Sequence, residues 1–223
     1  MAPSFNNTLI DLYNALLHRF GPQHWWPGDS PFEIMVGAVL TQNTNWTNVE
    51  KAIANLKNAN CLTPHAIHNL THEQLAPLIK PAGYFNLKAR RLKNLINWLI
   101  QTCDGDLSVL QNYSTSRLRE ELLSINGIGQ ETADSIILYA FEKLTFVVDT
   151  YTFRVLVRHG RIDADSHYEQ IKDYCESNLP DDLSLYNEFH ALIVRVGKDH
   201  CKPRAKCANC PLEPFEHSLE EPY

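Results

Sequence analysis

Residues 122–138 read Leu-Leu-Ser-Ile-Asn-Gly-Ile-Gly-Gln-Glu-Thr-Ala-Asp-Ser-Ile-Ile-Leu. The pattern predicts an amphipathic helix that ends at Ile125, a tight turn that contains Gly127 and Gly129, and a second helix directly after the turn. Glycine permits positive φ angles and lets the backbone approach another surface closely. Because the second helix would begin with exposed N–H groups and a positive dipole end, the stretch predicts a hairpin that binds a phosphate group. An ordinary turn between two helices is the alternative interpretation.

Helical patterns continue along most of the chain. Ser30-Pro31 and Thr63-Pro64 each combine a capping residue with a proline suited to the first helical position. Residues 71–74 predict a capping box, and Gly21 is expected to end the first helix. The strand-like run at 145–148 has no pairing partner, so we interpret it as an extended connector. The predicted fold class is all-α, with many short helices and short loops.

The composition limits the function classes. Of 223 residues, 44% are hydrophobic and 21% are charged, which is typical of a globular protein. Apolar runs are too short for a membrane span, and the N-terminus lacks the pattern of a secretory signal. We therefore expect a cytoplasmic protein without a membrane partner. A net charge of −6 argues against coating of nucleic acid by bulk charge, yet a DNA enzyme with a local basic patch remains compatible with it.

An aspartate follows the hairpin. Residues 147–151 read Val-Val-Asp-Thr-Tyr, so Asp149 ends an apolar run just before a predicted helix. An N-cap is one interpretation, because aspartate caps helices well. After a phosphate-binding hairpin, the carboxylate could instead face C1′ of a bound sugar.

Five motifs together resemble the helix-hairpin-helix (HhH-GPD) DNA glycosylase superfamily, in its endonuclease III branch. They lie at 37–44 (Gly-Ala-Val-Leu-Thr-Gln-Asn-Thr), 83–89 (Gly-Tyr-Phe-Asn-Leu-Lys-Ala), 122–138, 148–154 (Val-Asp-Thr-Tyr-Thr-Phe-Arg) and in a C-terminal cysteine cluster.

The resemblance implies a monomeric base excision repair enzyme. It would have a six-helix barrel over 29–140 and a second helical subdomain made of 1–28 and 141–223, with a DNA-binding cleft between them. Its partner would be double-stranded DNA, from which a damaged nucleotide is flipped into the cleft.

One departure from the family pattern concerns the nucleophile. The bifunctional members carry a lysine after the hairpin that forms a Schiff base, and Glu131 occupies this position here. A carboxylate cannot form a Schiff base, so we predict a monofunctional hydrolase without lyase activity. Asp149 would then be catalytic, orienting or deprotonating water and stabilising positive charge on the sugar. Glu131 could also be simply a favourable anion in the first helical turn.

Three tryptophans are candidates for the base pocket. Trp25 and Trp26 precede Pro27, and Trp46 follows the first family motif. Aromatic faces attract a cationic base, and the Trp-Trp-Pro sequence resembles the 3-methyladenine glycosylase offshoot of the family. We therefore predict an alkylated purine as substrate, with packing as the alternative role of these rings. Oxidised or mismatched pyrimidines are the second substrate hypothesis, and a non-catalytic DNA-binding protein is the third.

Further DNA contacts come from family positions. Gln42 would fill the gap left by the flipped base, and Tyr84 and Phe85 would form a wedge in the base stack. Gln42 could equally be a buried amide that bonds to backbone. The basic side chains that could track phosphates are Lys88, Arg90, Arg91, Lys93, Arg154 and Arg158.

Three cysteines cluster near the C-terminus, at Cys201, Cys207 and Cys210. The iron–sulfur loop of the family has a fourth cysteine, whose position falls here at Glu216, with His217 beside it. Clustered thiols suit a soft metal, so we favour a [4Fe–4S] cluster with an altered fourth ligand. Zinc held by the three cysteines and His217, or a loop without metal, are the alternatives.

Overall fold

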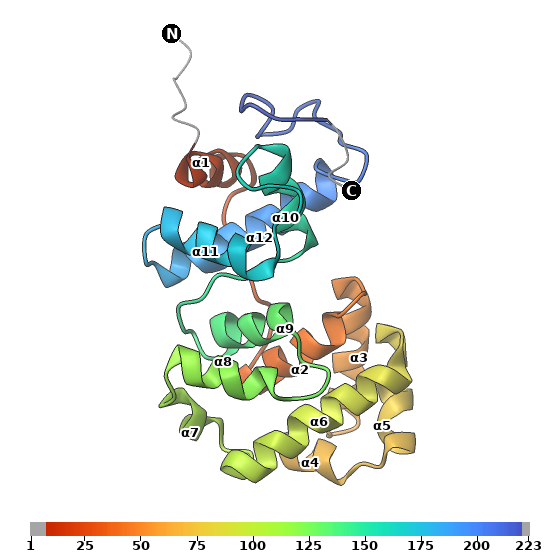
Figure 1. The fold of residues 1–223 in the computed structure, drawn as a ribbon. Coiled ribbons are helices and arrows are strands. Elements are labelled where there is room, and N and C mark those ends of the chain that lie inside the picture. Colours follow the sequence, from red (N-terminus) through yellow and green to blue (C-terminus); the bar gives the residue numbers. More distant parts are fainter. Residues whose placement is uncertain (1–7, 220–223) are drawn as a thin grey trace. The chain divides into compact units, whose positions relative to one another are not determined.

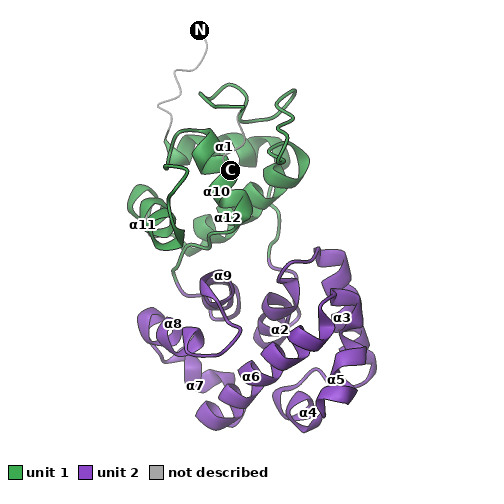
Figure 2. Cartoon of the chain, turned by 45° about the vertical axis from the view of Figure 1, so that its right-hand side comes forward, with its two compact units in different colours: residues 1–25, 144–223 green, residues 26–143 purple. Residues whose placement is uncertain are grey.

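The structure is a computed structural model that describes residues 8–219, and the regular structure of these residues is helical with no strand (Figure 1). The all-α prediction is confirmed. The chain forms two compact units (Figure 2). Unit 2 comprises residues 26–143, and unit 1 combines the described residues up to Trp25 with those from Leu144 onward.

The longest element of unit 2 is α6 (Phe85–Cys103), and the remaining elements of this unit are shorter helices. The elements before α6 are α2 (Pro31–Thr41), α3 (Trp46–Asn58), α4 (Pro64–Asn69), α5 (His72–Leu78) and the 3-10 turn η1 (Lys80–Ala82). The elements after it are α7 (Leu107–Gln111), α8 (Thr115–Leu123), α9 (Gln130–Ser135) and the π-helical turn η2 (Ile136–Ala140).

Side-chain caps fix the starts of these helices. The hydroxyl of Ser30 accepts from the Glu33 amide, and the hydroxyl of Thr63 accepts from the Ala66 amide. Thr71 forms the predicted capping box with Gln74. Each cap satisfies a backbone N–H that has no partner within the helix, so the three predicted helix starts are confirmed.

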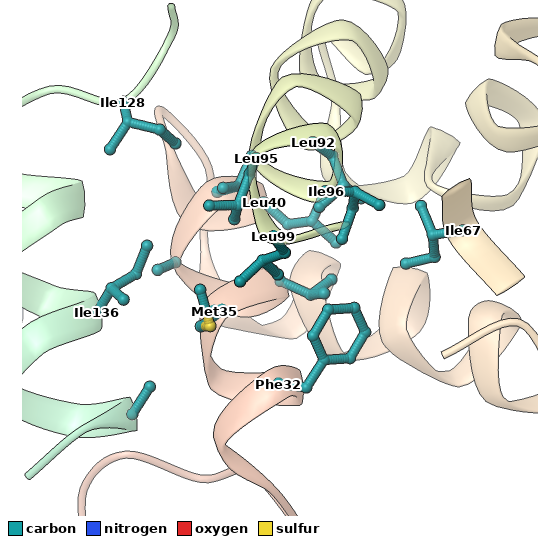
Figure 3. Close-up of a cluster of buried hydrophobic side chains, with 14 of the residues drawn as sticks. Phe32, Met35, Leu40, Ile67, Leu92, Leu95, Ile96, Leu99, Ile128 and Ile136 are labelled. Carbon is teal, nitrogen blue, oxygen red and sulfur yellow. The ribbon is translucent and has the colours of Figure 1, made fainter. Parts of the chain in front are cut away.

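The core of unit 2 lies between α2 and α6. Figure 3 shows Met35 and Leu40 of α2 beside Leu92, Leu95 and Leu99 of α6, and all five side chains are buried. Helix α2 is buried on most of its faces, unlike a helix at the surface. Its C-terminal end, which carries Gln42 at the C-cap, is therefore held by a closely packed interior.

Unit 1 contains α1 (Leu9–Phe20), α10 (Thr150–Arg158), α11 (Tyr168–Asn178) and α12 (Leu183–Asp199). Helices α10 and α12 approach closely at Gly197, where a Cβ atom would lie 2.3 Å from Cδ1 of Tyr151. Glycine at this position therefore permits the close contact.

The run at 145–148 is an extended connector, as predicted. Two of its backbone N–H groups bond to side chains: Phe146 N donates to Glu176 Oε1 at 2.8 Å, and Val148 N donates to the Tyr168 hydroxyl at 3.4 Å. Among residues 8–219, no helix combines the length and the apolar character needed to cross a membrane.

Candidate active site and DNA interface

The hairpin between α8 and α9 depends on one glycine with left-handed geometry. Gly127 has a φ of +98°, and a Cβ atom there would lie 2.3 Å from Cγ of Arg91. Gly129, the N-cap of α9, has a φ of −94° and no atom within 4 Å of a Cβ position. The positive φ that glycine permits is therefore used at Gly127 and not at Gly129, which leaves space above the turn with ordinary backbone geometry.

A buried ion pair joins the two helices of the hairpin. Nε of Arg119 on α8 donates to Oδ1 of Asp134 on α9 at 2.8 Å, and Nη2 donates to Oδ2 at 3.1 Å. Asp134 is 0% exposed, so the two-point contact fixes the helices on either side of the turn. This pair was not predicted from the sequence. The signal that could have revealed it is a carboxylate on the inward face of an apolar helix, which requires a cation.

Gln42 is bonded to this hairpin. Its Nε2 donates to the Gly127 carbonyl at 3.1 Å and to the Thr132 hydroxyl at 3.0 Å. Its Oε1 accepts from Nη1 of Arg91 at 2.5 Å. The structure thus brings together Gln42, Gly127 and Arg91, three of the residues that the sequence analysis considered for DNA contact.

Tyr84 and Phe85 differ in exposure. Tyr84 is 70% exposed and has a φ of +45°, a left-handed conformation that is uncommon for a bulky residue. Phe85, the first residue of α6, is partly buried against the core of unit 2. Of the two wedge candidates, Tyr84 has the side chain that is available for contact.

Lys88 and Arg154 are buried, contrary to the prediction that they track phosphates. Lys88 is 1% exposed, and its Nζ donates to two backbone carbonyls. Arg154 is 7% exposed, and its Nε donates to the Cys201 carbonyl at 2.6 Å. Neither cation lies at the surface, so the phosphate assignment is wrong for both.

Asp149 caps α10 with one carboxylate oxygen. Its Oδ1 accepts from the Thr152 amide at 2.7 Å and from the Thr152 hydroxyl at 3.0 Å. Its Oδ2 lies 3.6 Å from Nε2 of His190 on α12, and both side chains are largely buried. The N-cap interpretation is therefore correct, but it accounts for Oδ1 only.

The surroundings of Asp149 favour its charged form. Burial raises the pKa of the carboxyl, but the contact with His190 and the hydrogen bonds from Thr152 outweigh burial and hold the pKa below its usual value. Asp149 is consequently a carboxylate at neutral pH. His190 was not predicted as a site residue, because no local sequence pattern connects α12 with the start of α10.

Two of the three candidate tryptophans form an aromatic cluster in unit 2. The rings of Trp26 and Trp46 lie 5.2 Å apart edge to face, and Trp26 also lies 5.1 Å from the Tyr139 ring. The indole N–H of Trp46 donates to Oε1 of Glu50 at 3.0 Å. Trp25 belongs to unit 1, where Nζ of Lys198 lies 5.8 Å from its ring centre.

The three clustered cysteines line one small cavity of about 20 Å³ in unit 1, together with His217 and Arg158. Nη1 of Arg158 lies 3.3 Å from Sγ of Cys201 and donates to it. Burial raises the pKa of Cys207, and that of Cys210 to about 11.

The donor set of this cavity suits a soft metal, although its geometry is not that of a formed site. Within residues 8–219, no group of three or more His, Cys, Asp or Glu side chains lies where it could hold a metal ion. Of the two candidates for a fourth ligand, His217 lines the cavity, whereas Glu216 is exposed.

The chain belongs to the HhH-GPD superfamily of base excision DNA repair proteins, whose family model matches residues 36–181. It is 47% identical over 208 residues to a Methanocaldococcus jannaschii protein named as a DNA repair glycosylase, covering 93% of this chain and 94% of that protein. The chain is a DNA glycosylase of base excision repair.

Two solved structures resemble the chain. One is the Helicobacter pylori 3-methyladenine DNA glycosylase (MagIII) bound to 1,N6-ethenoadenine, with 30% identity and a TM-score of 0.74, covering 86% of this chain and 97% of that chain. The other is a trapped endonuclease III–DNA covalent intermediate, with 25% identity and a TM-score of 0.78, covering 91% of each chain.

Proposed function

We propose that this glycosylase removes alkylated purines such as 3-methyladenine from double-stranded DNA by hydrolysis, without cleaving the strand. The observation that carries the proposal is the carboxylate of Asp149, buried and kept ionised, whose Oδ2 is not used by the helix cap. Glu131 in the first turn of α9 supports the hydrolytic route, because it supplies no amine for a Schiff base.

Asp149 acts on the sugar in this mechanism. The N-glycosidic bond breaks with its electron pair going to the base, and positive charge develops at C1′. The carboxylate stabilises that charge, orients the water whose oxygen bonds to C1′ and accepts the proton that this water loses. The products are the free purine and an abasic site.

An alkylated purine needs little help from the enzyme to leave. It is cationic, and departure with the bonding electron pair neutralises its ring, so no general acid is required. Trp26 and Trp46 would bind such a cation, with a contribution of roughly 0.5–2 kcal/mol for each good cation–π contact. The hydrogen bond from Trp46 to the Glu50 carboxylate makes the indole more electron-rich and thereby strengthens this attraction.

The hairpin, Gln42 at the end of α2 and Tyr84 at the start of α6 would together hold the duplex. Backbone N–H groups at Gly129 and beyond would bind a phosphate. Gln42 would leave its bonds to the hairpin to fill the gap in the base stack, and Tyr84 would form the wedge.

We also propose that Cys201, Cys207 and Cys210 hold a [4Fe–4S] cluster that organises the C-terminal loop.

Release of identified bases tests the substrate. The protein and Asp149→Asn are incubated with duplexes that carry 3-methyladenine, 1,N6-ethenoadenine, thymine glycol or uracil opposite guanine, and released bases are identified by mass. We expect release of the alkylated purine by the wild type and a loss of about 10³-fold in Asp149→Asn, with DNA binding retained. Removal of oxidised or mismatched pyrimidines is the second candidate function, and release of those bases alone would refute the purine assignment.

A further inference from the structure

Helix α6 carries a buried lysine that bridges two segments of unit 2. Nζ of Lys88 donates to the carbonyl of Leu40 at 2.8 Å and to the carbonyl of Ala82 at 2.7 Å. Leu40 lies in the last turn of α2, and Ala82 ends η1. One side chain therefore joins the ends of two elements that are far apart in the sequence.

The chemistry of helix ends explains why a cation is suitable there. The last four carbonyls of a helix have no partner within it, and they form the negative end of the helix dipole. An amine with several N–H groups can satisfy two such carbonyls at once. Lys88 thus replaces the water that these carbonyls would bind if they were exposed.

Each carbonyl lies two residues before a proposed DNA contact. Leu40 precedes Gln42, the C-cap of α2, and Ala82 precedes Tyr84. The segment between Ala82 and α6 is unusual, because Gly83 and Tyr84 both have left-handed φ angles of +70° and +45°. Such a conformation persists for a tyrosine only when its surroundings hold the backbone in place.

We propose that Lys88 is a positioning residue that sets the separation between Gln42 and Tyr84, so that both side chains enter the duplex together. The inference rests on the proposed function, since it takes Gln42 and Tyr84 as DNA contacts. Holding the backbone of both segments in place before binding avoids part of the cost of ordering them in the complex, and only the Gln42 side chain must exchange its hairpin bonds for the duplex.

The same helix offers a matched control. Nζ of Lys93 donates to the carbonyls of Ile67, His68 and Leu70 at 3.3, 2.6 and 2.9 Å, at the end of α4. These three carbonyls occupy the Lys93 ammonium, so the structure does not support the expectation that Lys93 tracks phosphates. Lys93 caps a helix end in the same way as Lys88, but none of its partners precedes a proposed DNA contact. Loss of Lys93 removes a comparable structural interaction without affecting the spacing of Gln42 and Tyr84.

Hydrogen exchange tests the bridge without DNA. In Lys88→Met we expect backbone amides of both segments, 41–43 and 83–85, to exchange about 10-fold faster or more than in the wild type. Lys93→Met should leave both segments unchanged. A response in one segment alone, or in neither, would overturn the inference. If Lys88→Met does not fold, Lys88→Gln gives a second variant, whose shorter amide cannot reach both carbonyls.

Binding to a duplex with an abasic-site analogue opposite 2-aminopurine tests the consequence. Lys88→Met should reduce the 2-aminopurine fluorescence change and weaken binding to this duplex about 10-fold, while its binding to undamaged duplex stays near that of the wild type. Lys93→Met should match the wild type in both the fluorescence change and the affinity. If Gln42→Ala and Tyr84→Ala alter the signal but Lys88→Met does not, the positioning role alone is wrong. If Gln42→Ala and Tyr84→Ala leave the signal unchanged, the DNA-contact assignment fails, and the inference fails with it.

Discussion

Nε2 of His190 lies 3.6 Å from Oδ2 of Asp149, and this pair connects α12 with the start of α10. Thr152 holds the other oxygen, Oδ1, by two hydrogen bonds. The two oxygens thus have separate roles, since Oδ1 caps the helix and Oδ2 faces the His190 imidazole. The close approach of α10 and α12 at Gly197 places the imidazole within reach of the carboxylate.

Replacement of His190 should make excision sensitive to acid. Contacts with His190 and Thr152 outweigh burial and keep the pKa of Asp149 below its usual value, so the wild-type carboxylate is ionised throughout the range from about pH 5 to 8. In His190→Leu the contact that opposes the effect of burial is lost, so the pKa of Asp149 rises. We expect an acid limb to enter this pH range in single-turnover excision rates. His190→Gln, which can still donate to Oδ2, should show a smaller change, and identical profiles for all three proteins would contradict the role.

The two hairpin glycines should respond differently to alanine. Gly127→Ala places a methyl group against Arg91 in a left-handed conformation, so we expect a loss of about 1–3 kcal/mol in the free energy of unfolding and weaker DNA binding. In Gly129→Ala the methyl group enters open space at an ordinary φ, so the free energy of unfolding should stay within about 0.5 kcal/mol of the wild-type value. Denaturant unfolding and anisotropy at one fixed salt concentration check both effects. Equal losses in the two variants would argue against this account of the turn.

Local features of the fold could be predicted from the sequence. Ser30, Thr63 and Thr71 cap helices through residues three positions away, so the information lies within one turn. The hairpin and Asp149 could be recognised for the same reason, because short motifs carry them.

Contacts between distant segments could not be predicted in this way. Lys88 looked like a surface cation because its two acceptors, at Leu40 and Ala82, belong to other elements. His190 was missed because only the packing of α12 brings it to Asp149. A lone sequence shows which residues can be charged, but the long-range packing of helices decides which of these charges are buried.

Borohydride trapping should give no covalent complex between this protein and the DNA that it excises. Borohydride would reduce the Schiff base between a lysine amine and C1′ to a stable amine adduct, but Glu131 in the first turn of α9 provides no amine. Endonuclease III, with a DNA substrate of its own, serves as the positive control. After base release the strand should remain intact until alkali is added. A trapped adduct of this protein, or strand cleavage before alkali, would show a lyase step and refute the monofunctional proposal.

Removal of a cysteine should reveal whether the C-terminal loop holds a metal. If a cluster is present, the purified protein contains iron and sulfide and absorbs broadly in the visible range, and Cys207→Ser loses both signals and is less stable. Cys175→Ser is the matched control, because Cys175 is buried in α11 and does not line the cavity of the three clustered cysteines, so its substitution should retain the metal. Zinc in place of iron would support the alternative ligand set with His217. Absence of any metal from freshly purified protein would contradict the cluster proposal. The loop would then be stabilised by its hydrogen bonds from Arg154 and Arg158.

The stability contributed by Lys88 should increase as the pH rises above 8. Burial, aided by the nearby charge of Arg91, lowers the pKa of Lys88 to about 8 from 10.5. Between these two values the unfolded chain binds more protons than the folded chain, so the free energy of unfolding rises with pH. The neutral amine keeps two N–H groups and can still donate to both carbonyls. The unfolding free energy of the wild type minus that of Lys88→Met, measured in denaturant from pH 7 to 10, should therefore grow with pH. The comparison uses this difference because the cysteine thiols, which also titrate in this range, affect both proteins equally. A difference that stays constant over this range would mean that the buried amine titrates as it does in the unfolded chain.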